Sequence, residues 1–167
     1  MSLKYESIFS QKQKDWCLPA CLQTILYKKE IETTQEDISK KFTRNKILGV
    51  DFNLETLNSF LKPHSLTSNF YNPFMEQIEL DLFLREDSTN NDDILLAYNF
   101  QQINSIPKEA SKHTSLIIEY NPRKETTWIW EPESNQILSL SLKQVLMSIR
   151  PAEDKDYGFY TITPTKI

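Results

Sequence analysis

Glycine, cysteine and histidine are all scarce in this chain of 167 residues, which contains two of each. The two glycines lie far apart, so the chain has no glycine-rich loop of the kind that binds phosphate groups. Two cysteines do not make a disulfide scaffold, and we expect free thiols. A zinc site needs four suitably spaced ligands, whereas His64 and His113 lie far from each other and from the cysteines. We therefore expect no metal site.

Long apolar runs and a strong charge of one sign are also missing. No stretch approaches the roughly 20 apolar residues that a membrane-spanning helix needs. The N-terminal residues MSLKYESIFSQKQK lack the apolar run and the cleavage site of a signal peptide. The net charge is -4 and the basic residues are scattered, which argues against nucleic acid as a partner. We expect a cytoplasmic protein, with signal-independent secretion as an effector left open, and the oligomeric state stays open too.

The composition is that of a folded protein with one core. Apolar residues make up 39% of the chain and aromatic residues 11%, which suits a single domain over 1–167. The first part of the chain predicts helices from Cys17 to about Lys29, from Thr33 to Phe42, and from Asn53 to Pro63.

Short apolar or aromatic runs separated by turn residues dominate the later part of the chain and predict strands. The further elements that we expect are a strand over 65–71, a helix over 74–84, strands over 94–100, 113–120, 126–131 and 157–163, and a helix over 141–149. Helices come first and strands follow, without an alternating rhythm. This order predicts an α+β fold, in which a helical half packs on a C-terminal antiparallel sheet.

The segment KDWCLPACLQTIL holds both cysteines, one helical turn apart at the start of the first helix. Asp15 is the candidate N-cap, and Pro19 is compatible with a first turn, where its missing N–H would be unpaired anyway. Unpaired N–H groups and the helix dipole stabilise a thiolate at this end, which Cys17 occupies. Cys21 lies one turn further in and is better placed to face the core. We therefore predict one nucleophile and one buried bystander, because a disulfide across one helical turn would be strained.

His113 begins a strand that precedes the turn NPRKE and the return strand TTWIWE. A hairpin centred near Pro122 places Glu131 opposite His113, and a centre one residue later places Glu133 there instead. Directly opposed side chains lie ~4.5–5.5 Å apart at Cβ, so either carboxylate could orient the imidazole. A nucleophile, a base and an orienting carboxylate are the parts of a hydrolytic triad.

The order of these residues resembles that of papain-fold cysteine peptidases, most closely the bacteriocin-leader-processing (double-glycine) peptidases and their stand-alone bacterial relatives. Gln11 precedes Cys17 as a glutamine precedes the DCG-x-x-C type segment of that family, and Cys21 matches the second cysteine. Glu131-Pro132 matches the DP that follows the family's histidine strand, and LETLNSFLKPHSL resembles its middle helix and turn. The WC pair before a small-residue helix is also similar to papain-like effector proteases of bacterial pathogens.

The resemblance implies a papain-like fold and an acyl-enzyme mechanism on a peptide or protein substrate. It makes Cys17 the nucleophile, His113 the base and Glu131 the orienting carboxylate. The oxyanion-hole side chain would be Gln11, with Gln13 as the alternative. No metal or organic cofactor takes part in that mechanism.

Two departures from the family pattern keep other functions open. The family has glycine after the nucleophile, where this chain has Leu18 and Pro19, and it has aspartate where this chain has the longer Glu131. The alternatives are a catalytically inactive papain-fold domain that binds peptides, and a cysteine acyltransferase or amidase that acts on a non-protein substrate. A coincidental constellation in an unrelated α+β protein is a third.

The aromatic residues near the triad suggest where a substrate groove would lie. Trp16 adjoins the nucleophile and is the candidate wall of such a groove. Trp128 and Trp130 share one face of their strand, and Glu131 lies on the other, so we expect both indoles to point away from Glu131. His64 is expected in an exposed turn with no chemical role.

Overall fold

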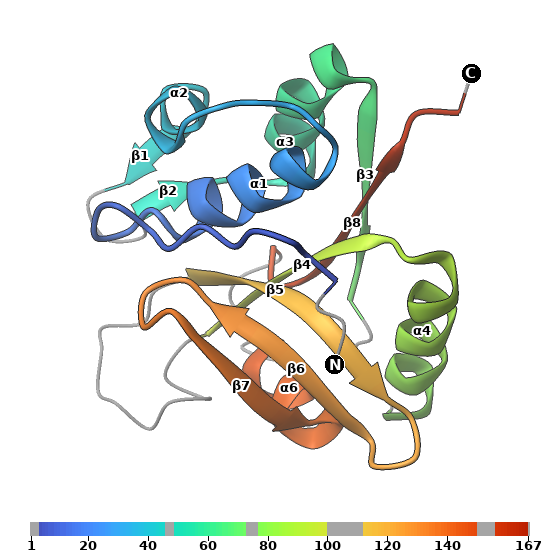
Figure 1. Ribbon diagram of the computed structural model, residues 1–167. Helices are drawn as coiled ribbons and strands as arrows, with labels where there is room; N and C mark the ends of the chain where they lie inside the picture. The colour runs from blue at the N-terminus through green and yellow to red at the C-terminus, as the bar shows by residue number, and fades with distance from the viewer. Residues whose placement is uncertain (1–3, 46–48, 73–76, 100–111, 150–155, 167) are drawn as a thin grey trace.

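A six-stranded antiparallel sheet forms the middle layer of the protein (Figure 1). The computed structural model describes residues 4–45, 49–72, 77–99, 112–149 and 156–166. The strands of the sheet lie in the order β3 (Leu66–Tyr71), β8 (Gly158–Pro164), β4 (Asp93–Asn99), β5 (Lys112–Asn121), β6 (Thr126–Glu131) and β7 (Gln136–Ser141). The other elements are α1 (Cys17–Lys28), α2 (Gln35–Ser39), the hairpin of β1 (Thr43–Asn45) and β2 (Gly49–Asp51), α3 (Leu54–Leu61), the 3-10 helix η1 (Lys62–His64), α4 (Gln77–Asn90) and α6 (Leu142–Ile149).

Each face of the sheet carries its own hydrophobic core. Helices α1, α2 and α3 pack on one face, and α4 and α6 pack on the other (Figure 1). The alternation of side chains along a strand sends neighbouring residues into different cores. In β6, Trp130 enters the core beneath α1, whereas Ile129 enters the core beneath α4 and α6. The structure thus confirms the expected α+β class, with helices on a largely C-terminal antiparallel sheet.

Helix α1 begins at Cys17, as expected, but the expected N-cap is wrong. The residue at the N-cap is Trp16, without a side-chain cap hydrogen bond. Its N–H donates to the carbonyl of Gln13 at 3.2 Å, which closes a turn before the helix. Within that turn Asp15 has a left-handed φ of 69° and is exposed. The turn buries Trp16 and leaves the Asp15 carboxylate at the surface, so it does not cap the helix.

The next two helices are capped at their N-termini by side chains. The N-cap of α2 is Thr34, whose hydroxyl accepts the N–H of Asp37 at 3.1 Å. This N-cap lies one residue after Thr33, where the helix was predicted to start. Helix α3 begins after Asn53 as predicted, and its capping box pairs Asn53 with Thr56. Caps of this kind contribute about 1 kcal/mol each.

The β1–β2 hairpin and strand β7 were not predicted from the sequence, and α4 extends further than the predicted helix. Helix α4 continues to Asn90 through the polar residues REDSTN, beyond its predicted end at Leu84. Of these residues only Asp87 is buried, so the polar run belongs to the outer face of the helix. Strand β7 is an edge strand with four of its six residues exposed, and such a strand has little apolar signal in its sequence.

Asp93 joins α1 to the sheet through a buried cluster of ion pairs. Its side chain is 1% exposed, and its two carboxylate oxygens lie 2.8 Å from Lys28 Nζ and 2.7 Å from Lys29 Nζ. Replacing Asp93 by alanine is expected to lower the free energy of unfolding by about 2–4 kcal/mol, because it leaves two lysines unpaired. Both lysines are about one-fifth exposed and regain some hydration, which keeps the loss in this range.

Denaturant unfolding of the Asp93→Ala variant measures this loss directly. The matched control is Asp37→Ala, which removes an exposed ion pair with Lys40. The control should lose far less stability, because exposed pairs contribute little. Equal losses in the two variants would contradict the role given to Asp93.

Among the described residues, no helix has the length and apolar character needed to cross a membrane.

Candidate active site

His113 and Glu131 lie in direct contact at one end of the sheet. Nε2 of His113, the second residue of β5, lies 2.5 Å from Oε1 of Glu131, the last residue of β6. Both side chains are buried, with 7% and 1% of their surfaces exposed. The Glu131 carboxylate also accepts the backbone N–H of Glu133 at 2.8 Å and that of Ser134 at 2.6 Å. Three donors therefore fix the carboxylate, which in turn fixes the imidazole ring.

The pKa values of this pair follow from these contacts. Burial by itself would raise the pKa of Glu131, but the hydrogen bond and charge of His113, together with Ser134 and Glu133, lower it to about 2. Burial would lower the pKa of His113, but the charge of Cys17 and hydrogen bonds with Cys17 and Glu131 raise it to about 9. The structure therefore favours an imidazolium next to a carboxylate over the whole neutral range.

Glu131 reaches His113 diagonally rather than from the directly opposed position. The ladder between β5 and β6 pairs Leu116 with Trp130, and the same register continued by three residues would place Glu133 opposite His113. The hairpin centred near Pro122 is therefore wrong, and the alternative centre fits the register. The contact is nevertheless made by Glu131, because diagonal neighbours on one face lie within reach of a long side chain. The glutamate, one methylene longer than aspartate, suits this diagonal.

Cys17 completes the group from the opposite half of the chain. It is the first residue of α1 and 7% exposed. Burial would raise the pKa of its thiol, but the charge of His113, a hydrogen bond with the ring, and backbone hydrogen bonds from Thr114 and Leu18 lower the pKa below its ordinary value. Because Nε2 of His113 faces Glu131, Nδ1 is the ring nitrogen left for Cys17. The three side chains thus form a chain of contacts from thiol to imidazole to carboxylate.

Cys21 lies in a different environment from Cys17, as the sequence predicted. Its side chain is fully buried in the core beneath α1, and its thiol donates to the Thr114 carbonyl at 3.6 Å. Burial, with the nearby charges of Cys17 and Glu131, raises the pKa of this thiol well above its ordinary value. Cys21 is therefore an inert packing residue at neutral pH.

The two candidate oxyanion-hole glutamines lie in different places. The backbone N–H of Gln11 donates to the carbonyl of Pro132 at 3.2 Å, which joins its segment to the turn after Glu131. Its Oε1 is buried and has no hydrogen-bond partner among the described residues. Gln13 is exposed, and its backbone carbonyl caps the turn before α1. Gln11 is thus the glutamine whose segment contacts the residue that follows Glu131.

The three tryptophans belong to the core beneath α1 or pack against it. Trp16, the expected groove wall, is 5% exposed, and most of its indole therefore lies in that core. The turn that makes it the N-cap directs its indole inward. Trp130 lies in the same core, with Trp128 packed against it, whereas Glu131 follows on the opposite face. Both indoles therefore point away from Glu131, as the alternation predicted.

Two residues near His113 were missed from the sequence. The ring of Tyr98 meets the imidazole edge to face, with centroids 5.5 Å apart, and its hydroxyl lies 3.0 Å from that of Ser115. Lys112, directly before His113, is buried with 5% of its surface exposed. Nothing in the apolar run of β4 distinguishes Tyr98 as a neighbour of His113. A lysine directly before the histidine is a weak sequence signal for Lys112.

His113, Glu131 and Glu133 form the group within the described residues that comes nearest to a metal site, with ligand atoms within 4.8 Å of one another. Both oxygens of Glu131 already accept backbone N–H groups, and one also contacts the imidazole. A cation would have to displace these contacts. The residues fit an orienting carboxylate better than a cation site.

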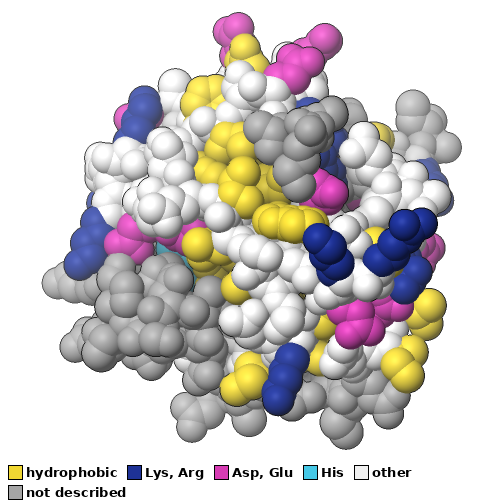
Figure 2. Space-filling view, turned by 60° about the horizontal axis from the view of Figure 1, so that its bottom comes forward, with side chains coloured by type: hydrophobic (Ala, Val, Ile, Leu, Met, Phe, Trp, Pro, Cys, Tyr) yellow, Lys and Arg dark blue, Asp and Glu magenta, His cyan; other side chains and the backbone are white. Residues whose placement is uncertain are grey.

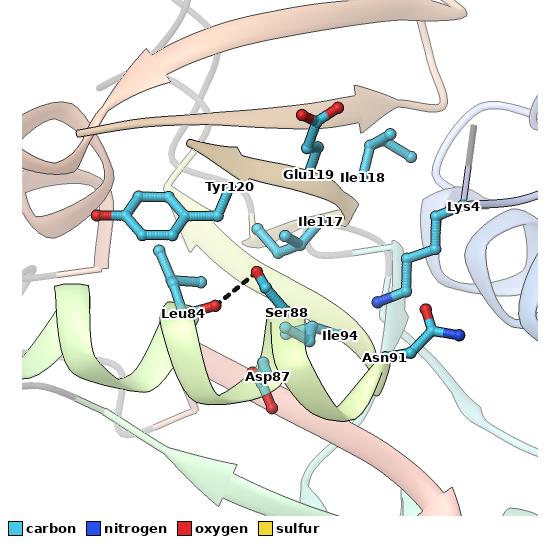
Figure 3. Close-up of a pocket in the computed structure, with 10 residues that line it drawn as sticks. All are labelled: Lys4, Leu84, Asp87, Ser88, Asn91, Ile94, Ile117, Ile118, Glu119 and Tyr120. Atoms are coloured by element: carbon cyan, nitrogen blue, oxygen red, sulfur yellow. Dashed lines mark hydrogen bonds between the residues drawn. The ribbon is translucent and has the colours of Figure 1, made fainter. Parts of the chain in front are cut away.

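A cavity of about 390 Å³ lies away from this group, between α4 and β5 (Figure 3). Leu84, Asp87 and Ser88 contribute from the helix, and the Ser88 hydroxyl donates to the Leu84 carbonyl at 2.7 Å. None of the candidate catalytic residues lines this cavity.

Charged side chains of both signs are interspersed on the face shown in Figure 2, and the basic side chains of its described residues form no continuous surface.

No protein-family model matches the chain, and the comparison with curated proteins finds no match. Solved structures do match. One is a double-glycine-motif protease from an AMS/PCAT transporter in complex with its leader peptide, with 12% identity, a TM-score of 0.61, and 94% of this chain and 91% of that chain covered.

Two further matches are similar in extent. The peptidase domain of Streptococcus ComA, a bifunctional ABC transporter of a quorum-sensing pathway, has 11% identity and a TM-score of 0.63, with 93% of this chain and 95% of that chain covered. A C39-like peptidase from Bacillus anthracis has 10% identity and a TM-score of 0.67, with coverage of 96% and 95%. At 10% to 12% identity the likeness shows the fold, and it confirms what the sequence motifs predicted: this chain has the papain-like fold of the double-glycine peptidase domains.

Proposed function

We propose that this protein is a cysteine peptidase that cleaves a peptide bond through an acyl-enzyme. The observation that carries the proposal is the contact chain from Cys17 through His113 to Glu131. The contacts lower the thiol pKa and raise the imidazole pKa, and both shifts favour a thiolate–imidazolium pair. Such a pair is the activated nucleophile of this enzyme class.

In the first half of the reaction, the Cys17 thiolate attacks the carbonyl carbon of the scissile bond, and the carbonyl electron pair moves to the oxygen. The imidazolium of His113 then gives its proton to the leaving nitrogen, and the C–N bond breaks to leave a thioester. In the second half His113 takes a proton from water, whose oxygen attacks the thioester and releases Cys17. Glu131 keeps its negative charge throughout and holds the ring in one orientation.

The backbone N–H of Cys17 and the side-chain amide of Gln11 would hold the oxyanion. The anchoring of Gln11 to Pro132 supports this assignment over Gln13, which is exposed. One such donor is typically worth about 2.7–4 kcal/mol in the transition state.

The residues that replace the family's glycine do not obstruct this mechanism. Leu18 is fully buried in the core beneath α1, and its backbone contacts the Cys17 thiol. Pro19 lies in the first turn of the helix, where its missing N–H leaves no hydrogen bond unmade. These placements support an active enzyme over a domain that only binds peptides.

Cleavage of a peptide tests the proposal directly. The leader peptide bound in one of the similar structures makes a leader segment ending in two glycines the first substrate to try. We expect the protein to release a C-terminal product, detected by mass spectrometry, and the Cys17→Ala variant to release none. Transfer of the acyl group to an added amine instead of water would assign an acyltransferase. Binding of the peptide without any covalent adduct at Cys17 would contradict the proposal.

A further inference from the structure

The strand that carries His113 begins with a buried ammonium group. The Lys112 side chain is 3% exposed, and its Nζ donates to the backbone carbonyl of Phe52 at 2.6 Å and lies 4.3 Å from the centre of the Phe52 ring. The carboxylates of Asp51 and Asp156 lie 3.8 Å and 3.9 Å from the same Nζ. Burial of an ammonium group is costly unless such contacts compensate it, so a lysine here calls for an explanation.

Lys112 and His113 leave opposite faces of β5, because successive residues of a strand alternate. The lysine reaches Phe52 in the core beneath α1, whereas the imidazole meets Tyr98 and Glu131 and also contacts Cys17 at the N-terminus of α1. Phe52 belongs to the core beneath α1 and is 2% exposed. Lys112 therefore connects the start of β5 to Phe52, in the segment that follows β2.

The same segment also contacts the loop that precedes the nucleophile. The N–H of Val50 donates to the carbonyl of Asp15 at 3.4 Å, two residues before Cys17. Val50 and Phe52 are both buried in one core with Trp16. Residues 50–52 therefore touch the approach to Cys17 at one end and the residue before His113 at the other. We call residues 50–52 the bracket.

The bracket matters because the nucleophile and the base belong to different halves of the chain. Cys17 is the first residue of α1 and His113 the second residue of β5, and no single helix or strand sets the distance between them. One connection runs through the Cys21 thiol, which donates to the Thr114 carbonyl at 3.6 Å. The bracket supplies a second connection, and two points of attachment fix an orientation that one point leaves free.

We propose that Lys112 is a positioning residue, which holds His113 at the Cys17 thiol by clamping the start of β5 to the bracket. This inference rests on the proposed function. It predicts that loss of the ammonium group weakens the thiolate–imidazolium pair as well as the fold. A merely structural lysine would affect the fold alone.

The test compares Lys112→Met with Lys28→Met, in a Cys21→Ser background, by the pH dependence of Cys17 alkylation with iodoacetamide. Methionine keeps an unbranched apolar side chain against Phe52 and removes the charge. Lys28 is the matched control, because its ammonium also joins α1 to the sheet, through Asp93, but at the end of the helix remote from Cys17. Melting temperatures of both variants are measured in parallel.

Lys112→Met is expected to slow alkylation at pH 6 by about tenfold or more and to move the pH profile toward that of an ordinary thiol, since small displacements of reacting groups have effects of this size. Lys28→Met is expected to lower the melting temperature and leave the profile unchanged. Lys112→Arg, which keeps the charge and a donor for Phe52, should restore part of the rate. An unchanged profile in folded Lys112→Met overturns the proposal.

If Lys112→Met does not fold, the Asp51→Ala variant tests the proposal instead. The Asp51 side chain is 41% exposed, so its loss removes one contact of the Lys112 ammonium group and disturbs the fold less. A shift of its alkylation profile in the same direction supports the proposal, and an unchanged profile overturns it.

The alkylation profile of the parent protein distinguishes a failure of the proposed function from a failure of the role given to Lys112. If its own Cys17 alkylates like an ordinary thiol, the proposed function fails, whereas a reactive parent with unaffected Lys112 and Asp51 variants removes only the role of Lys112.

Discussion

Replacing His113 by alanine is expected to slow the alkylation of Cys17 at pH 6 by at least about tenfold, with Cys21 replaced by serine so that one thiol is observed. The largest influence on the Cys17 thiol is burial, which raises its pKa, and the charge and hydrogen bond of His113 are the largest influences that lower it. Without the imidazole, only the backbone hydrogen bonds from Thr114 and Leu18 still oppose the effect of burial on the thiol pKa. The thiol pKa then rises, and the thiolate fraction at pH 6 falls with it.

The sign of the pH dependence follows from the same shifts. The thiolate–imidazolium pair exists above the lowered pKa of Cys17 and below the His113 pKa of about 9. Peptidase activity, which needs the imidazolium proton, should therefore fall on both sides and show its alkaline limb near pH 9. Alkylation needs only the thiolate and should persist above that limb.

The control for His113→Ala is His64→Ala, which removes the other histidine, in the 3-10 helix η1. It should leave the alkylation profile of Cys17 unchanged. Slow alkylation of the parent protein that rises only around pH ~8.5, and that does not depend on His113, would match an ordinary thiol and contradict the proposed enzyme.

Replacing Glu131 by glutamine is expected to lower the catalytic rate by about a hundredfold, the scale on which general acid–base catalysis depends on a correctly held base. Both carboxylate oxygens accept backbone N–H groups, from Glu133 and Ser134. An amide cannot accept at both positions, because its NH₂ group would face a donor. The imidazole then loses both its orientation and a charge that raises its pKa.

The pH profile distinguishes this effect from simple loss of stability. Since Glu131 contributes to the raised pKa of His113, the alkaline limb of the activity should move from about pH 9 toward neutral in Glu131→Gln. Glu131→Asp keeps the charge but shortens the reach, so it should lose rate because the diagonal contact with His113 lengthens.

Glu133→Gln is the matched control, because Glu133 is exposed and stands near the same imidazole. It should leave the rate and the alkaline limb almost unchanged. A loss in Glu133→Gln as large as that in Glu131→Gln would show that the directly opposed carboxylate, and not the diagonal one, orients the base.

The glutamate pair illustrates what a sequence leaves undecided. The hairpin of β5 and β6 is evident from the runs TSLIIEY and TTWIW, but its register depends on the turn and on an irregularity between Ile117 and Glu119. One extra residue in β5 shifts every pair beyond it. The sequence has no glycine or other signal at that point, so both Glu131 and Glu133 remained candidates.

The tryptophan next to the nucleophile illustrates a second limit. A residue at a helix N-terminus can lie inward or outward, depending on the turn before the helix. Here the turn from Gln13 to Trp16, with a left-handed Asp15, buries the indole. Backbone conformation at a single residue decided the placement, and no periodicity reports it.

The sequence by itself determined the features that depend on local pattern. Apolar spacing and a proline compatible with a first turn placed Cys17 at the start of α1, and the period of two in TTWIWE separated Trp130 from Glu131. The order of helices before strands predicted the α+β fold. These features follow from contacts between residues close in the chain, which residue type and spacing encode.

The tertiary structure alone decided which distant residues meet. It brought Cys17 to His113, selected Glu131 for the imidazole, placed Gln11 beside Pro132, and buried Lys112 against Phe52. Each of these contacts joins segments far apart in the chain, and its geometry depends on strand register, loop conformation and the packing of two cores together. Residue type and spacing along the chain do not determine these three features. The residues of the site could therefore be named from the sequence, whereas their arrangement could not.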